Sequence, residues 1–319
     1  MQVMKKNDSI DYLKAFAAIL VVTHHAILYS GADVTAGILE KLFTLIISVH
    51  VPLFFMIAGY LCRRQPLMPY FRKKFLRIIV PFVTFSLLKI LYSHWISDEF
   101  AHAVSLPDQL IDAFVMGGLY WFPYAIVLCY GFAVPLWRAR TGVLAAVLAA
   151  AVAVNILVDL PAVEVFAYFQ IGNALQNFCF FLMGMLVNRC ADGLATVFTK
   201  GKYAIFAGAA VVIWMGVSLP VAYTFWIKLL LAVSAAVLLW ALSRTLPENI
   251  KVLKTVGKYS LQIMFFDSLH KIILFPMLGM LGMTGAVLTI AVIVLDVALC
   301  CAACTLLEKI PVIRRLFGL

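Results

Sequence analysis

The chain has 319 residues, of which 65% are hydrophobic and only 13% charged, and its mean hydropathy is +1.04. Soluble domains carry about 25% charged residues, so this composition excludes an ordinary soluble protein and indicates a polytopic helical membrane protein. The formal net charge of +10 does not indicate nucleic-acid binding, because the basic residues gather in short segments between apolar stretches, where anionic lipid headgroups account for them.

Ten segments are long and apolar enough to cross a bilayer as helices, which takes roughly 20 residues each. They are 10–30, 40–61, 76–96, 119–137, 142–159, 167–188, 203–219, 224–243, 258–277 and 285–306. We therefore expect an all-α polytopic membrane protein with about ten transmembrane helices. We also expect residues 1–319 to form a single integral-membrane domain with no soluble domain.

The distribution of charge predicts the orientation of these helices, because Lys and Arg accumulate in cytoplasmic loops. Basic residues occupy the N-terminus and every second connection: Lys5 and Lys6; Arg63, Arg64, Arg72, Lys73, Lys74 and Arg77; Arg138 and Arg140; Arg189, Lys200 and Lys202; Arg244, Lys251, Lys254 and Lys258; and Lys309, Arg314 and Arg315. The other connections have almost no basic residues and hold Asp33, Glu40, Asp98, Glu99, Asp108, Asp112, Asp159 and Glu164. The alternation predicts that both termini are cytoplasmic, in a multi-pass protein of the cell membrane, typical of a bacterial cytoplasmic membrane.

The first predicted helix carries a polar stripe. Asp11 and Lys14 can pair at i, i+3 near its cytoplasmic end, and His25 lies eleven residues beyond Lys14, on the same face. His24 points about 100° away from that face. Ionisable residues inside a membrane helix are costly and indicate a functional site. The alternative is that Lys14 extends to the inner headgroups and His25 bonds a neighbouring helix.

The second predicted helix contains His50 in its outer half, just before Pro52. His50 is a candidate catalytic residue that would approach His25 across the first hairpin, or else an interhelical hydrogen-bonding residue beside a proline kink. The segment "RRQPLMPYFRKKFLR" follows this helix. Its density of cations suggests an anionic ligand, with contacts to lipid headgroups as the alternative.

Polar residues also interrupt three of the later spans. Asn173 and Asn177, at the start of the sixth span, are candidates for lining a substrate path, with helix packing as the alternative. Asp267 and Asp296 fall near the middle of the ninth and tenth spans, where an unpaired carboxylate is unfavourable. Each is expected to be neutral or paired, with Lys89 or His270 as partners, or to take part in catalysis or proton handling.

The seven cysteines lie in or near the spans, and none is in a predicted outer loop: Cys62, Cys129, Cys179, Cys190, Cys300, Cys301 and Cys304. This placement implies no disulfide framework, and we expect no metal site.

Several segments resemble, in order, the motifs of acyltransferase family 3, the integral-membrane O-acyltransferases. The segment "IDYL" is followed by Lys14 and, after ten residues, His25, where the family usually has Arg and His. "HVPLFFMIAGYL", "FRKKFLRIIVPF", "LYWFPYAIVL" and "FFLMGMLVNR" resemble further family segments, with Ala58 in place of the usual Ser. "VGKYSLQIMFFDSLH" resembles its Gly-x-x-Ser-Leu-x-x-Tyr-x-x-His helix, but Met264 replaces the Tyr and Asp267 stands where the His is common.

This resemblance implies transfer of an acyl group, usually acetyl, from cytoplasmic acyl-CoA to a hydroxyl of an extracytoplasmic glycan, lipid-linked sugar or other envelope acceptor. Polysaccharide O-acetylation is one such reaction. His25 would be the general base, with Lys14, Asp11, His50 and Asp267 as further candidate catalytic residues. The candidate acyl-CoA contacts are Arg72, Lys73, Lys74 and Arg77, and the candidate acceptor contacts are Trp121, Asn173 and Asn177. Acyl-CoA would be a substrate, and no cofactor is expected to be bound permanently.

A proton-coupled transporter or flippase of an envelope precursor is the alternative function, since buried His, Asp and Lys residues also relay protons. Transporters usually have repeated halves and paired broken helices, and the sequence shows neither. A third alternative, a lipid-binding scaffold, leaves the stripe that contains Lys14 and His25 unexplained.

Overall fold

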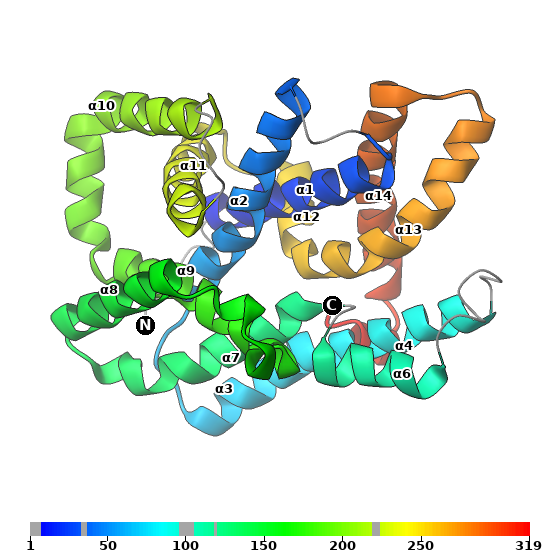
Figure 1. Ribbon diagram of the computed structural model, residues 1–319, viewed down its shortest axis with the longest axis horizontal. Coiled ribbons are helices and arrows are strands. Elements are labelled where there is room, and N and C mark those ends of the chain that lie inside the picture. Colours follow the sequence, from blue (N-terminus) through cyan, green and yellow to red (C-terminus); the bar gives the residue numbers. More distant parts are fainter. Residues whose placement is uncertain (1–7, 33–36, 96–104, 118–119, 219–223) are drawn as a thin grey trace. The chain divides into compact units, whose positions relative to one another are not determined.

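The computed structural model describes residues 8–32, 37–95, 105–117, 120–218 and 224–319. These residues are predominantly helical, and no β-strand occurs among them (Figure 1). The predicted all-α class is therefore confirmed.

Seven helical stretches among the described residues are long and apolar enough to span a membrane. They are Asp8–Tyr29, Gly37–Tyr60, Leu67–Tyr92, Leu106–Arg138, Tyr168–Arg189, Phe225–Thr245 and Gly285–Leu307. An eighth is obtained if Ser260–Asp267 and Leu269–Met280 form one bent span, and two apolar helices, Thr141–Leu157 and Ile205–Met215, are shorter. Each of the ten predicted segments thus overlaps a helix. The number ten and the cytoplasmic termini stay predictions.

The chain divides into two compact units. Unit 1 consists of residues 1–57 and 190–305, and unit 2 of residues 58–189 and 306–319. Two of the boundaries fall inside the continuous helices α2 (Gly37–Tyr60) and α14 (Gly285–Leu307). The single-domain organisation stays a prediction, and each unit is described by itself.

In unit 1, helix α1 (Asp8–Tyr29) packs against three other helices. These are α11 (Phe225–Thr245), α12 (Lys251–Lys258) and α13 (Ser260–Met280). The buried face of α1 is rich in small residues, with Ala15, Ala17, Ala18 and Ala26 all fully buried. Small side chains let membrane helices approach closely, so this face accounts for the central position of α1. Helix α10 (Ala191–Ser218) packs on α11.

Hydrogen bonds and an ion pair join the first turns of α1 to α12 and to the residues just before it. The hydroxyl of Tyr12 donates to the carbonyl of Pro247 at 2.8 Å and accepts from the backbone N–H of Ile250 at 2.9 Å. Lys254 forms an ion pair with Asp8 at 2.9 Å, and this hydrogen bond raises the pKa of the Lys254 ammonium. These contacts fix the end of α1 that carries Asp11 and Lys14.

Helix α13 is bent by 59° between Ser260–Asp267 and Leu269–Met280 (Figure 1). Its second half packs on α14 through a small apolar cluster that contains Leu274, Leu278 and Val292. Asp267 is the last residue before the bend, and His270 and Lys271 lie in the first turn after it. The bend therefore lies at the polar centre of this helix.

In unit 2, α3 (Leu67–Lys74) continues through a π-helical turn, η1 (Phe75–Ile79), into α4 (Val80–Trp95). Helix α9 (Ile171–Arg189) packs on α7 (Trp121–Ala133) and on α8 (Thr141–Leu157). The other described helices of the unit are α6 (Leu106–Ile111), the π-helical turn η2 (Asp112–Met116), the short 3₁₀ turns η3 (Val134–Arg138), η4 (Leu160–Ala162), η5 (Glu164–Phe166) and η6 (Tyr168–Gln170), and the C-terminal α15 (Pro311–Leu316). The ring of Phe317, directly after α15, packs edge-on against Phe85 of α4, with centroids 4.9 Å apart.

Candidate active site

The centre of the site is a hydrogen bond between His25 of α1 and Asp267 of α13. The Nδ1 atom of His25 lies 2.5 Å from Oδ2 of Asp267. The Asp267 side chain is 0% exposed, whereas that of His25 is 35% exposed. A carboxylate that accepts from Nδ1–H leaves Nε2 of a neutral imidazole with its lone pair available. The pair thus presents a basic nitrogen on the more accessible of the two side chains.

Asp267 belongs to a larger buried network of charged groups. Its Oδ1 pairs with the ammonium of Lys271, one turn further along α13. That ammonium also lies 3.7 Å from Oδ2 of Asp296 on α14, and the other oxygen of Asp296 is 2.9 Å from Nδ1 of His270. Asp267, Lys271 and Asp296 are each 0% exposed. The expected partnership of Asp296 with His270 is confirmed.

The prediction that Asp267 pairs with Lys89 or His270 is wrong. Asp267 pairs with His25 and Lys271, and His270 pairs with Asp296 instead. The reason is the bend in α13, which places Asp267 and His270 against different helices. The ammonium of Lys89, the other expected partner, lies 5.3 Å from the centre of the Tyr120 ring.

The thiol of Cys300 completes this network but does not form a nucleophilic triad. Its Sγ lies 3.4 Å from Nδ1 of His270 and 3.3 Å from Oδ1 of Asp296. A triad histidine uses one nitrogen for the nucleophile and the other for the carboxylate, whereas here both partners face the same nitrogen. The ligand atoms of these three residues lie within 4.8 Å of one another, so they have the spacing of a metal site. The ammonium of Lys271 already provides Asp296 with a counter-charge.

The two adjacent histidines of α1 face different neighbours, as their 100° separation predicts. The His24 ring packs against Phe43 and His50 of α2, with centroids 5.2 and 4.9 Å away. His25 faces Asp267 of α13. His50 therefore packs against His24, and its Nδ1 bonds the carbonyl of Ile46 in its own helix at 2.6 Å.

The pair at the start of the polar stripe is formed as predicted. The ammonium of Lys14 lies 3.2 Å from Oδ1 of Asp11, which is buried while the Lys14 side chain is 28% exposed. The backbone of Asp11 is in close contact with Gly257 of α12, where a side chain would collide with it. Asp11 and Lys14 thus belong to the anchored end of α1, and His25 lies about 16 Å further along the helix axis.

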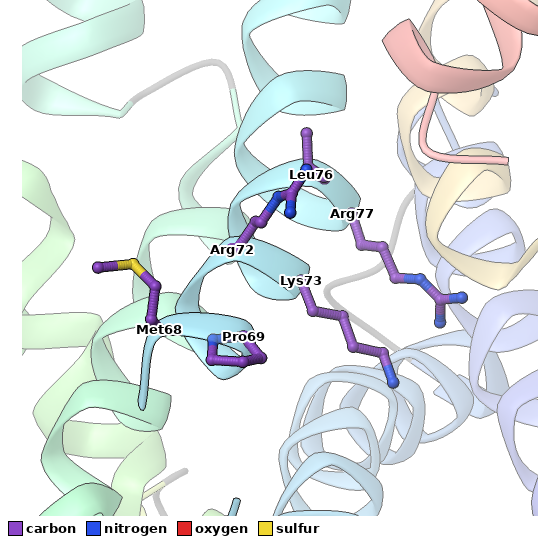
Figure 2. Close-up of a pocket in the computed structure, with 6 residues that line it drawn as sticks. All are labelled: Met68, Pro69, Arg72, Lys73, Leu76 and Arg77. Carbon is purple, nitrogen blue, oxygen red and sulfur yellow. The ribbon is translucent and has the colours of Figure 1, made fainter. Parts of the chain in front are cut away.

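The basic segment of unit 2 forms a pocket of about 430 Å³ at the junction of α3 and η1 (Figure 2). It is lined by Met68, Pro69, Arg72, Lys73, Leu76 and Arg77, so it contains three cations and no carboxylate. Lys73 and Arg77 are four residues apart, and Figure 2 shows their side chains extending to the same side of the helix. Three cations that line one pocket beside apolar side chains suit a phosphorylated ligand.

Lys74, the remaining candidate acyl-CoA contact, has different surroundings. Its ammonium lies over the ring of Tyr130 of α7, 3.4 Å from the centroid, and 5.6 Å from that of Tyr70. A cation held against aromatic faces in this way stabilises helix packing. We therefore assign the pocket to Arg72, Lys73 and Arg77.

The candidate acceptor contacts lie in the packed layer of α7 and α9. Asn173 donates to Oε1 of Gln170 at 2.5 Å, and Asn177 donates to the carbonyl of Asn173 at 2.9 Å. Gln170 itself donates to the carbonyl of Met116. Oδ1 of the buried Asn177 has no hydrogen-bond partner among the described residues, which leaves one acceptor for a ligand or water. Trp121, partly exposed at the start of α7, packs edge-on against Phe122.

Sequence reasoning missed Lys271, although a signal was present. Lys271 lies four residues after Asp267 in an apolar segment, the spacing at which opposite charges pair on one face of a helix. The role of Cys300 and the contact between His24 and His50 had no comparable local signal, because each depends on a second helix.

Comparisons with known proteins identify the family. Residues 7–307 match the model of the acyltransferase domain, which covers nearly the whole chain and every residue of the network around His25. No curated protein and no solved structure gave a significant match. With seven or eight helices able to span a membrane in the described part of the chain and a family match over this length, the chain belongs to the family of membrane acyltransferases that this domain defines.

Proposed function

We propose that the protein transfers an acyl group, acetyl in the simplest case, from acyl-CoA to a hydroxyl of an envelope acceptor, with His25 as general base. The observation that carries this proposal is the hydrogen bond from His25 Nδ1–H to the buried Asp267. It favours one tautomer and aims Nε2 of a partly exposed imidazole away from the carboxylate. A base fixed in this way suits deprotonation of a hydroxyl.

The reaction then has a simple balance of bonds and protons. The acceptor hydroxyl gives its proton to His25 Nε2 while its oxygen bonds the thioester carbonyl carbon. The C–S bond breaks, and the CoA thiolate takes the proton back from the imidazolium. The negative charge that develops on the carbonyl oxygen would be stabilised by hydrogen-bond donors in a site with little water.

The donor is proposed to bind by its phosphates in the pocket of Arg72, Lys73 and Arg77. Three exposed cations without a carboxylate among the lining residues support this assignment. Charge-assisted contacts to phosphate are about twice as strong as neutral hydrogen bonds, so such a pocket holds a nucleotide without a dedicated fold. These residues belong to one of the basic connections, which the charge pattern predicts to be cytoplasmic.

The acceptor is proposed to be extracytoplasmic: a polysaccharide, a lipid-linked sugar or another hydroxylated envelope molecule. The support for this is the resemblance in sequence and the position of His25 in the last two turns of α1, at the end opposite to Asp11 and Lys14. Trp121, Asn173 and Asn177 remain the proposed acceptor contacts. The partly exposed indole of Trp121 would stack on a sugar ring, and the amides would bond its hydroxyls.

The test is whether purified protein consumes acyl-CoA. Protein in detergent or nanodiscs is given acetyl-CoA and a panel of soluble and lipid-linked glycans, and free CoA thiol and acetylated product are measured by mass spectrometry. We expect acceptor-dependent release of CoA in the wild type, and none in His25→Ala. A proton-coupled transporter would move a glycan or precursor across proteoliposomes without consuming acyl-CoA. That result would replace the proposed function.

A further inference from the structure

Lys271 is buried between the carboxylates of Asp267 and Asp296, and Asp267 is the one that bonds the candidate base His25. Its ammonium pairs with Oδ1 of Asp267 and lies 3.7 Å from Oδ2 of Asp296, and all three side chains are 0% exposed. The second oxygen of Asp267 is the one that bonds His25. Asp267 is therefore held from both sides, by a cation on its own helix and by the imidazole of α1.

The charges of this network determine whether His25 can act as a base. A buried carboxylate without a cation is costly. The pair of His25 and Asp267 alone would therefore bind one additional proton, which makes the pair neutral overall. An imidazole that keeps this proton cannot accept another from a hydroxyl. The ammonium of Lys271 supplies the missing positive charge. It allows Asp267 to be ionised while His25 stays neutral.

We propose that Lys271 is a positioning residue for His25: its ammonium keeps Asp267 ionised and oriented, so that Asp267 accepts Nδ1–H of a neutral, base-competent His25. This inference rests on the proposed role of His25 as base. Asp296 has the opposite effect on His25, because it competes with Asp267 for the ammonium of Lys271. It also pairs with His270 at 2.9 Å.

Other titratable groups lie near this network and are common to every variant compared below. They are His24 and Tyr29 of α1, His50 of α2, Lys228 of α11 and Cys300 of α14. Since they are unchanged in each comparison, a shift between variants reports the substituted charge.

The decisive substitution is Lys271→Met, which keeps an unbranched side chain and removes the charge. Removing a positive charge raises the proton affinity of every group nearby. The rise of kcat/KM with pH should therefore move to higher pH by about one unit or more, the effect of a charge within about 4–6 Å. At neutral pH kcat should fall about tenfold or more for the same reason, while KM for acyl-CoA changes less than about twofold, because Lys271 acts on the base and not on the donor.

Asp296→Asn is the second variant, and it removes a negative charge from the same network with little change in volume. The midpoint of the rise should then move to lower pH. Lys254→Met is the matched control. It also breaks a lysine–carboxylate pair of unit 1, that of Lys254 with Asp8 at 2.9 Å, but this pair lies at the other end of α1. Its midpoint should stay where the wild type has it. Size-exclusion profiles and thermal melting test whether each variant is folded.

A readout that does not depend on acyl transfer separates this inference from the proposed function. Diethyl pyrocarbonate modifies neutral imidazole, so the pH dependence of His25 modification, followed by peptide mass spectrometry, reports when His25 is neutral. We expect the same opposite shifts in Lys271→Met and Asp296→Asn as in activity. If modification shifts but no acyl transfer is found, the proposed function fails and the role of Lys271 in setting the charge of His25 stands. Unchanged midpoints for His25 in the folded variants, or shifts of the same sign in both, would overturn the inference. If Lys271→Met does not fold, Asp296→Asn decides alone, and an unchanged or raised midpoint in that variant overturns the inference.

Discussion

Nδ1 of His25 and Oδ2 of Asp267 are 2.5 Å apart, although 242 positions separate the two residues in the chain. One is near the end of the first helix, and the other is at the bend of α13. The contact combines a partly exposed imidazole with a buried carboxylate, the arrangement that favours one tautomer of a catalytic histidine. Among the described residues it links the polar stripe of α1 to the ionisable groups of α13 and α14.

The first prediction concerns the two neighbouring histidines of α1. His25→Ala should lower kcat by roughly 10²–10⁴-fold, the usual contribution of a general base, and leave acyl-CoA binding nearly unchanged. His24→Ala should cost less than about tenfold, because its ring packs on Phe43 and His50 of α2 and does not meet Asp267. Transfer rates and acyl-CoA affinity of both folded variants decide the matter. Equal losses would contradict the assignment.

The second prediction concerns Asp267. Asp267→Asn keeps the size of the side chain but loses the charge, so it no longer favours the tautomer with the proton on Nδ1. We expect kcat to fall about 10²–10⁴-fold with KM for acyl-CoA unchanged within about twofold. The buried Lys271 also loses its ion pair, which should destabilise the fold by about 3–5 kcal/mol. Melting curves measured beside the kinetics separate these effects, and a fully active, destabilised variant would leave Asp267 with a structural role alone.

The third prediction tests the pocket of unit 2. Lys73→Gln combined with Arg77→Gln should weaken acyl-CoA binding about tenfold or more and reduce its dependence on salt, because contacts of cations to phosphate are screened by ions. The matched control is Arg138→Gln combined with Arg140→Gln, which removes two exposed basic residues of the same unit that do not line the pocket. Calorimetric titration with acyl-CoA at low and high salt gives both quantities. Equal effects of the two pairs would indicate a surface potential rather than a binding site.

The fourth prediction concerns the close approach of α1 and α12. A Cβ at Gly257 would collide with the backbone of Asp11, whereas one at Gly208 of α10 would meet no atom within 4 Å among those described. Gly257→Ala should therefore destabilise the protein by about 1–3 kcal/mol, as overpacking of a tight contact does. Gly208→Ala should be neutral or slightly stabilising, because Ala is the better helix former. Thermal melting in detergent compares the two. A lower melting temperature for Gly208→Ala would refute this account of the packing.

The fifth prediction concerns orientation in the membrane. A cysteine introduced at Arg138 should be inaccessible to an impermeant thiol reagent in intact cells, and one introduced at Asp108 should be labelled. The reason is that connections rich in Lys and Arg stay cytoplasmic, whereas those that lack them are exported. The label is read in a background without Cys190, the exposed native thiol. Labelling at position 138 and not at 108 would reverse the topology.

Much of this architecture could be predicted from composition and local periodicity. The apolar segments overlap the helices, because a membrane helix satisfies its backbone within one segment. The pairing of Asp11 with Lys14 and the divergence of His24 from His25 follow from helical geometry alone. Each of these features involves residues less than two turns apart.

The arrangement of the network was decided by the tertiary structure. The partner of His25, the sharing of Lys271 by two carboxylates and the stacking of Lys74 on Tyr130 each join separate helices. The bend of α13 directs Asp267 and His270 to different neighbours, and no local pattern in the sequence predicts its angle. Helix formation depends on hydrogen bonds within one segment, so the sequence determines it directly. The pairing of buried charges depends on which helices pack together, because only a contact between helices brings such charges close enough to compensate one another.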